Sequence, residues 1–285
     1  FTAYPPTSIY TAFGQVTCQD NGQGLKGVTI TFSDGSGSVD TEAGGIWRKS
    51  GLKSMITVTP VKAGWAFSPA SKQVTPAASH ADFIARIAFE DSNLEAVIRE
   101  KIGKPTGQLT ITDVTYITEL DGGRRSISQL GGMQHLISLQ LLFLPENQIY
   151  DISPMAGLAN LTFLDMDKNQ IYDIRPLAGS IYLRNLYLDQ NQISDISPLA
   201  RLTYMNQLYL SRNLISDISP LAGLTDLDVL DLSNNLITDI SALVANTGLG
   251  NWDFIDLSYN LLDMSYDSDD MRNINLLMGR GVEVN

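Results

Sequence analysis

The ten residues NQISDISPLA, at positions 191–200, recur as near copies at three other places in the chain. The copies are NQIYDISPMA from residue 147, NQIYDIRPLA from residue 169 and NLISDISPLA from residue 213. With two weaker copies included, the asparagines are separated by 22, 22, 22, 22 and 25 residues. A repeat of this length predicts a solenoid, in which each unit buries its apolar face against its neighbours.

Apolar residues keep fixed places relative to each asparagine. The pattern before it is LxxLxxLxLxxN, as in Leu158, Leu161, Leu164 and Met166 of the coil that ends at Asn169. Isoleucine follows at the second and fifth places, and these recurring apolar side chains are expected to form the core of each coil. An earlier, degenerate copy has Arg125 where asparagine is expected. The prediction is therefore about seven repeats over residues 114–262.

The asparagine is expected to serve the turn after the strand of each coil. Its amide can donate to carbonyl groups and accept from N–H groups of the same and adjacent coils, which would make a structural ladder. Losing one rung should cost about 1 to 3 kcal/mol. The ladder residues are Asn147, Asn169, Asn191, Asn213, Asn235 and Asn260.

A column of aspartates lies four places after the asparagines: Asp151, Asp173, Asp195, Asp217 and Asp239. We expect each carboxylate to accept hydrogen bonds from backbone N–H groups of a turn, with cation binding left open as the alternative. In three coils a serine and a proline follow, as in Ser197 and Pro198. These pairs are expected to be the N-cap and first residue of a short helix, because proline needs no hydrogen-bond donor there.

The N-terminal part has a different pattern. Short runs rich in Val, Ile, Thr and aromatics, such as GVTITFSDGSGSV, are separated by turn-forming Gly, Asp, Ser and Pro. This pattern predicts an all-β sandwich spacer over residues 10–86, with residues 1–9 as a linker from a preceding domain. Gly44 and Gly45 lie between two strand-like segments and are expected to form a hairpin turn.

Both ends of the repeat are expected to be capped by helices. Residues 87–113 contain EDSNLEAVIREKIG, with Asp91 or Ser92 as N-cap and Gly103 as the stop, and they predict a helical N-cap. Residues 263–285 predict a C-terminal cap, with a helix in which Ile274, Leu277 and Met278 are apolar and a final strand in GVEVN. The acids of 263–270 are expected at the helix N-terminus, and cation binding there also stays open.

Charge and composition exclude several functions. The net charge is −12, and residues 1–85 hold six basic and five acidic side chains, so the rest carries −13. This field repels phosphates and anionic headgroups, so neither nucleic acid nor membrane insertion is expected. Cys18, His80 and His135 are the only Cys and His residues, and the chain lacks the common hydrolase and phosphate-binding motifs. We therefore expect no catalytic residues, no metal and no cofactor.

One face of each coil is free of these structural demands. Side chains of a strand alternate between core and surface, so positions −6, −4 and −2 before the asparagine should point outward, onto what we call the concave face. Aromatic and acidic residues gather there, which predicts a binding site and favours a partner with a basic surface. The candidate binding residues are Phe143, Phe163, Asp165, Asp167, Tyr187, Asp189, Tyr209, Asp231, Phe254 and Asp256.

The repeat, from about residue 88 to the end, resembles the leucine-rich repeats of internalins and related bacterial surface proteins. The N-terminal module resembles carboxypeptidase-regulatory-like and immunoglobulin-like modules of such proteins. The fold class predicted is an N-terminal all-β sandwich followed by a leucine-rich-repeat α/β solenoid with helical N-cap and C-cap. One departure is that internalins usually place the sandwich after the repeats.

The resemblance implies a non-catalytic protein-recognition or adhesion module of a secreted or cell-surface bacterial protein. Signal and anchor would lie outside residues 1–285. The alternative is a structural or polysaccharide-binding component of the cell surface or matrix, whose aromatic residues stack on sugar rings. A protein partner is preferred over a glycan, and the sequence does not identify it.

Overall fold

The computed structural model describes residues 9–285. Their contacts divide them into two compact units, one running to Phe89 together with Gln108–Asp113, the other comprising Glu90–Gly107 and Val114–Asn285. Residues 108–113, which the sequence prediction placed in the helical N-cap, therefore pack with the first unit. Of the predicted linker over residues 1–9, all but Ile9 lies outside the described residues.

The first unit contains two four-stranded sheets. One has the order β4-β1-β8-β6 and the other β3-β2-β5-β7. The strands are β1 (Tyr10–Cys18), β2 (Thr29–Phe32), β3 (Ser38–Asp40), β4 (Ile46–Leu52), β5 (Ile56–Val61), β6 (Trp65–Ser68), β7 (Lys72–Val74) and β8 (Phe83–Ile87). Val16, Trp47 and Phe83 from the first sheet and Ile30 and Val58 from the second form one buried core. The predicted sandwich is confirmed.

The predicted hairpin at Gly44 and Gly45 is wrong. These glycines end the short turn η1 (Ala43–Gly45), which joins β3 in one sheet to β4 in the other. Both adopt positive φ angles, 78° at Gly44 and 73° at Gly45. A Cβ atom on Gly45 would lie 2.1 Å from the carbonyl oxygen of Val16. Glycine is thus required here because the chain crosses from one sheet to the other with positive φ angles. A hairpin turn also needs glycine with positive φ between two strands, so the two cases look alike in the sequence.

The second unit begins with the predicted cap helix. Helix α1 (Ser92–Ile102) starts after Asp91, whose side chain accepts from the backbone N–H groups of Asn93 and Leu94. It ends at Gly103, which has a left-handed conformation with φ 67°. Leu94, Val97 and Ile98 are buried, so the helix covers the first coil with its apolar stripe. A single turn, α2 (Ile111–Val114), precedes the repeats, and all but its last residue belongs to the first unit.

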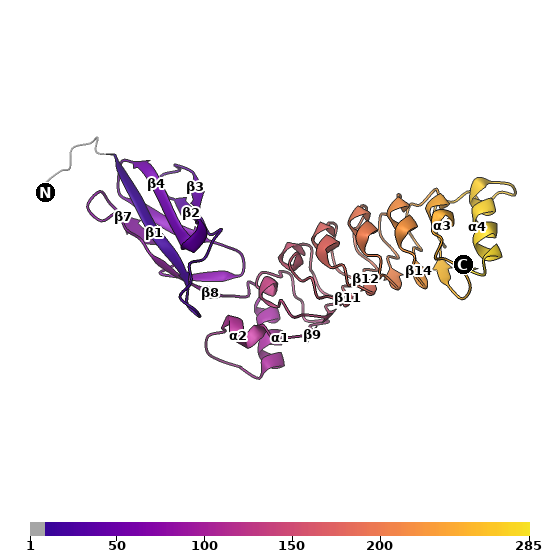
Figure 1. Ribbon diagram of the computed structural model, residues 1–285, viewed down its shortest axis with the longest axis horizontal. Coiled ribbons are helices and arrows are strands. Elements are labelled where there is room, and N and C mark those ends of the chain that lie inside the picture. The colour runs from indigo at the N-terminus through magenta and orange to yellow at the C-terminus, as the bar shows by residue number, and fades with distance from the viewer. Residues whose placement is uncertain (1–8) are drawn as a thin grey trace. The chain divides into compact units, whose positions relative to one another are not determined.

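Eight parallel strands form the sheet of the repeat, in sequence order from β9 to β16. Figure 1 shows them side by side along one face, with the short helical turns along the opposite face. The strands are β9 (Glu119–Asp121), β10 (Leu141–Phe143), β11 (Phe163–Asp165), β12 (Asn185–Tyr187), β13 (Gln207–Tyr209), β14 (Val229–Asp231), β15 (Phe254–Asp256) and β16 (Glu283–Val284). The turns are η2 (Met133–His135), η3 (Ser153–Met155), η4 (Arg175–Gly179), η5 (Ser197–Arg201), η6 (Ser219–Gly223) and α3 (Ser241–Ala245).

The register of the strands follows the repeat. Leu142, Leu164, Leu186 and Leu208 pair in succession at the middle of β10 to β13, and each is fully buried. The repeat thus places one leucine per coil in line through the core, and the residues on either side of it in line on the surface. The predicted solenoid and its apolar positions are confirmed.

The short turns begin differently from the prediction. Ser197 is the first residue of η5 and not its N-cap, which is Ile196 and makes no side-chain cap bond. Pro198 lies in the first turn, as predicted. The cap is supplied by the preceding aspartate, because Asp195 Oδ1 accepts from the backbone N–H of Ser197 at 2.8 Å. Equivalent bonds form at Asp151, Asp173, Asp217 and Asp239. The aspartate column therefore serves the turns, as expected.

The asparagines join consecutive coils. Asn191, for example, accepts at Oδ1 from the N–H of Ile171 at 2.9 Å and donates from Nδ2 to the carbonyl of Met166 at 3.0 Å. The same Nδ2 also donates to the carbonyl of Leu188 in its own coil at 3.1 Å. Bonds of this kind connect each asparagine from Asn147 to Asn260 to the preceding coil.

The C-terminal cap consists of α4 (Asp269–Gly279) and strand β16. Ser268 caps the helix through a bond from the N–H of Met271, and Asp269 and Asp270 lie in its first turn, where acids interact favourably with the helix dipole. Leu277 is fully buried and Ile274 is 9% exposed, whereas Met278 is 54% exposed. Met278 therefore lies on a face of α4 that points away from the last coil, and the predicted helix and final strand of the cap are present.

Candidate binding face

Strands β9 to β15 present the concave face through the residues on either side of the buried middle leucine or isoleucine. Positions −6 and −4 are the first and last residues of each three-residue strand, and position −2 follows two residues later. All ten candidate residues predicted from the sequence are half-buried, so each keeps part of its side chain accessible. This is the exposure expected of a sheet face that no other part of its unit covers.

Four aromatic side chains form a continuous row across β10 to β13. The ring centroids of Phe143 and Phe163 are 4.7 Å apart, those of Phe163 and Tyr187 are 5.3 Å apart, and those of Tyr187 and Tyr209 are 4.6 Å apart. Tyr187 and Tyr209 are nearly parallel, at 9°. The Tyr187 hydroxyl donates to Oε1 of Gln207 at 2.9 Å. The row is therefore held in place by contacts among its own members.

Three carboxylates line the row on the side where the strands end. Asp165 Oδ1 accepts from the N–H of Asp167 at 3.1 Å, and Asp167 Oδ1 accepts from the N–H of Asp189 at 2.7 Å. Asp189 Oδ1 in turn accepts from the N–H of Ser211 at 2.6 Å. Asp167 and Asp189 accept from N–H groups of the next coil. These bonds fix the positions of the two side chains and link adjacent coils.

The protonation of these carboxyl groups reflects their crowding. Burial, followed by the nearby Asp189 carboxylate, raises the pKa of Asp167 to about 7. Burial likewise raises the pKa of Asp165 and of Asp189 above the ordinary range. Within residues 9–285 none of the three forms an ion pair. Lys168 and Arg212 lower the pKa of Asp167 and Asp189 only in part, so a cation brought to this place would find negative charge that no ion pair of the described residues neutralises.

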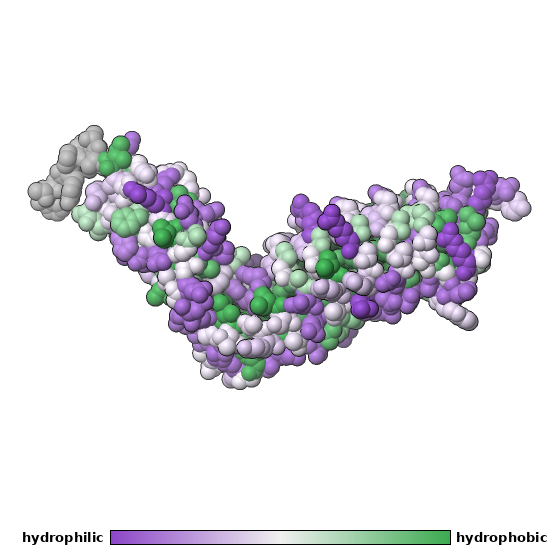
Figure 2. All heavy atoms as spheres, viewed as in Figure 1, coloured by the Kyte–Doolittle hydropathy of each residue, from purple (hydrophilic) through white to green (hydrophobic). Residues whose placement is uncertain are grey.

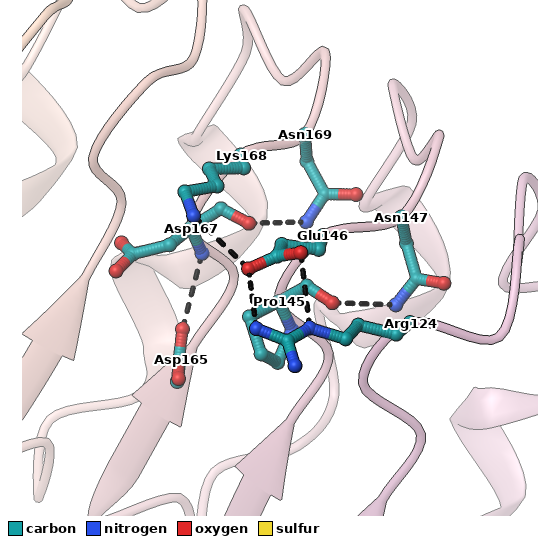
Figure 3. A network of polar contacts seen from close by, with 8 residues as sticks. All are labelled: Arg124, Pro145, Glu146, Asn147, Asp165, Asp167, Lys168 and Asn169. Atoms are coloured by element: carbon teal, nitrogen blue, oxygen red, sulfur yellow. Dashed lines mark hydrogen bonds and ion pairs between the residues drawn. The ribbon is translucent and has the colours of Figure 1, made fainter.

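A row of charged and polar side chains borders the concave face at position −1, and sequence reasoning missed it. Arg124 makes a bidentate pair with Glu146, at 2.9 and 3.0 Å, and Lys168 Nζ lies 3.0 Å from Glu146 Oε1 (Figure 3). The bonds from Arg124 hold the pKa of Glu146 at about 2. Residues at this position have positive φ, for example 55° at Glu146 and 54° at Arg212.

The signal for this row was present in the sequence. A polar residue precedes almost every asparagine, and the turn needs a left-handed residue there. None of the residues at this position is β-branched, the kind that this conformation disfavours most. In Figure 3 the Lys168 and Arg124 side chains converge on Glu146 beside the carbonyls that accept from Asn147 and Asn169. Arg124 and Lys168 thus form ion pairs with Glu146 at the border of the concave face, and not with Asp165 or Asp167.

The structure brings together some predicted residues and separates others. Phe143, Phe163, Tyr187 and Tyr209 with Asp165, Asp167 and Asp189 make one patch. Asp231 and Asp256 pair in register on β14 and β15, next to Tyr209, and Phe254 pairs with Val229. Phe254 is therefore separated from the aromatic row by an aliphatic residue. The view in Figure 2 shows only small, scattered hydrophobic patches on the repeat, as on most protein surfaces.

Other exposed aromatics lie outside the concave face. Tyr182 and Tyr204 stack at 6.4 Å in the turns that lead into β12 and β13, and Arg184 lies over the Tyr204 ring at 5.8 Å. Tyr150 and Tyr172 follow the asparagines and are 47% and 59% exposed. Within residues 9–285 no group of three or more Cys, His, Asp or Glu side chains is arranged to hold a metal ion.

The stacked coils, with one parallel strand and one short turn each, define the class of the second unit as a leucine-rich-repeat protein. The family model for leucine-rich repeats in two copies matches residues 183–223 and 205–245. No curated protein matches the chain significantly.

Two solved structures from Listeria monocytogenes are similar to this chain. Internalin C2 is 31% identical, with a TM-score of 0.52, over 69% of this chain and 94% of its own. An internalin, inlF, is 34% identical, with a TM-score of 0.62, over 69% of this chain. The chain belongs to the internalin family. It spans about half, 55%, of the length of the inlF structure.

Proposed function

We propose that this chain is a non-catalytic recognition module of a secreted or cell-surface bacterial protein, and that it binds a protein partner through its concave face. The observation that carries the proposal is the aromatic row of Phe143, Phe163, Tyr187 and Tyr209. Rigid rings that are half-exposed on a fixed sheet supply large contact area at little entropic cost, as they do in many protein interfaces.

The repeat itself does not require these rings. Positions −6, −4 and −2 lie outside the core pattern, and other coils have Asp121, Asp231 or Val229 at the equivalent strand positions. Stacking stabilises neighbouring strands by about 0.5 to 1.5 kcal/mol per pair, so part of the row's role is structural. The half-buried carboxylates beside the rings link adjacent coils through backbone N–H groups, and they also keep charge that no ion pair neutralises, which a partner with a basic surface could do.

A protein partner fits the ring geometry better than a polysaccharide. Sugars stack on an open ring face, whereas the faces of Phe163 and Tyr187 are covered by neighbouring rings at 4.6 to 5.3 Å. What these rings offer to a partner is mainly their edges, which suit apolar side chains. None of the helices in the described part of the chain has the length and apolarity needed to cross a membrane.

The test is capture of partners by immobilised protein, comparing wild type with a Tyr187→Ala/Tyr209→Ala variant. The matched control is Tyr150→Ala/Tyr172→Ala, which removes two exposed tyrosines outside the concave face. The proposal expects a partner that binds wild type and the control but not the concave variant, with both variants folded. A partner retained by the concave variant and lost by the control would refute it.

A further inference from the structure

The concave face has charge of one sign only. Positions −6, −4 and −2 of strands β9 to β15 contain no Lys, Arg or His. They carry seven carboxylates: Glu119, Asp121, Asp165, Asp167, Asp189, Asp231 and Asp256. Such a surface repels acidic partners and attracts basic ones over a distance of about one Debye length.

The aromatic row ends in a specific way at Tyr209. Its ring is stacked on Tyr187 on one side, at 4.6 Å and 9°. On the other side its register partner is Asp231 on β14, followed by Asp256 on β15. No aromatic side chain therefore continues the row toward β14, where the residue in register with Tyr209 carries a carboxylate instead of a ring.

Two carboxylates lie near enough to Tyr209 to affect its ionisation. Burial raises the pKa of Tyr209, and the Asp231 and Asp189 carboxylates raise it further. Asp231 uses Oδ1 to accept from the N–H of Ser233 at 2.9 Å, which orients the carboxylate. Its Oδ2 has no hydrogen-bond partner within residues 9–285, so it can accept from an incoming donor.

A planar cation satisfies all these groups at once. A guanidinium group can stack on an aromatic face and also donate two parallel hydrogen bonds to a carboxylate, whereas an ammonium group offers a compact charge without the plane. Arg212 borders this part of the face at position −1, and its charge partly offsets the rise in the pKa of Asp189. Within residues 9–285 it nevertheless forms no ion pair with Asp189 or Asp231. Asp231 therefore remains able to accept from a group of the partner.

We propose that the partner inserts an arginine side chain between Tyr209, Asp189 and Asp231, so that the concave face selects a basic segment of protein. This inference rests on the proposed function and specifies the chemistry of the partner. The aromatic row would contact the apolar side chains of the same segment, and the carboxylates would make binding selective for a positively charged segment.

The experiment uses a random 15-residue peptide library displayed on phage and selected on the wild-type chain. Peptides are then sorted by loss of binding to the Tyr187→Ala/Tyr209→Ala variant. Peptides that lose binding to this variant are called face-dependent. Each is synthesised in two forms, one with its arginines and one in which a single arginine is replaced by citrulline, which keeps the shape of the side chain and removes its charge. Affinities are measured for wild type and for Asp231→Asn, which keeps the bond from Ser233. Asp217→Asn is the control, because Asp217 accepts an equivalent turn bond outside the concave face.

The inference expects face-dependent peptides that contain arginine. It also expects a loss of about tenfold in affinity on changing one arginine to citrulline or on Asp231→Asn, and no change with Asp217→Asn. Face-dependent peptides without arginine, or peptides unaffected by citrulline and by Asp231→Asn, would overturn the inference and leave the proposed function standing. If no selected peptide depends on Tyr187 and Tyr209, the proposed function fails and the inference with it.

Discussion

Replacing Asn191 with alanine removes one rung of the ladder at the middle of the repeat. Asn191 is 9% exposed and accepts from the N–H of Ile171 at 2.9 Å. It also donates to the carbonyls of Met166 and Leu188, at 3.0 and 3.1 Å. Alanine can replace none of these bonds, and the small cavity that it leaves is surrounded by the backbone of two coils.

The expected loss follows from the groups left without partners. The buried N–H of Ile171 loses its acceptor, and a buried group of this kind costs about 1 to 3 kcal/mol when unpaired. The carbonyls of Met166 and Leu188 also lose a donor, which adds to this cost. We therefore expect the free energy of unfolding of the repeat unit to fall by roughly 2 to 4 kcal/mol. Because neighbouring coils stabilise each other, the loss should affect the whole unit and not one coil alone.

The assay is urea unfolding followed by circular dichroism, together with hydrogen exchange of the Ile171 amide. The control is Gln192→Ala, since Gln192 is the next residue, is exposed, and makes no side-chain hydrogen bond in the described residues. Asn191→Ala should lower the urea midpoint and accelerate exchange at Ile171, and Gln192→Ala should do neither. A midpoint within error of wild type for Asn191→Ala would refute the reasoning.

Three further predictions concern protonation, backbone and turns. The folded-state pKa of Asp167 is raised to about 7, so this carboxyl lowers stability as pH rises from 4 to 8. Asp167→Asn should therefore raise thermal stability at pH 8, by about 1 to 2 kcal/mol after allowing for solvent screening, but not at pH 4; an equal gain at both pH values contradicts this. Gly45→Ala should destabilise the sandwich by more than about 3 kcal/mol and Gly44→Ala by about 1 kcal/mol, because only the first meets a backbone oxygen. Equal unfolding midpoints for the two would refute the steric argument. Asp195→Ala should cost about 1 kcal/mol in urea unfolding and Asp195→Asn less, since only asparagine still accepts from Ser197; equal losses would argue against a capping role.

The period of the repeat made most of the second unit predictable. A fixed spacing of apolar residues can be satisfied only by stacked coils, so the core positions and the outward rows follow from counting. The cap helix was predictable because Asp91 and Gly103 carry the start and stop signals that helix ends require. The sandwich followed from alternating strands with turn residues between them.

The errors share a physical cause, which is that short-range signals do not fix long-range pairing. Gly44 and Gly45 show that positive φ is needed, but not whether the next strand returns to the same sheet or crosses to the other. Ser197 was assigned the capping role that Asp195 fills two residues earlier, since both residue types accept from backbone N–H groups.

The candidate face was predictable as a set of positions but not as an arrangement. Counting from Asn191 and Asn213 places Tyr187 and Tyr209 on the surface. The stacking at 4.6 Å and the end of the row beside Asp231 depend on side-chain rotamers and register. The raised pKa of Asp167 depends on burial by neighbouring coils, which no single coil encodes.

The most direct test of recognition by the concave face is site-specific photo-crosslinking to a captured partner. The photoreactive residue p-benzoylphenylalanine would replace Asn185 or Val229, which flank the aromatic row at position −6. In control proteins it would replace Tyr172 or Tyr182, which are exposed elsewhere on the repeat. The account predicts crosslinked partner from positions 185 and 229 and none from 172 and 182. Crosslinks from 172 or 182 alone would place the partner on another surface and contradict it.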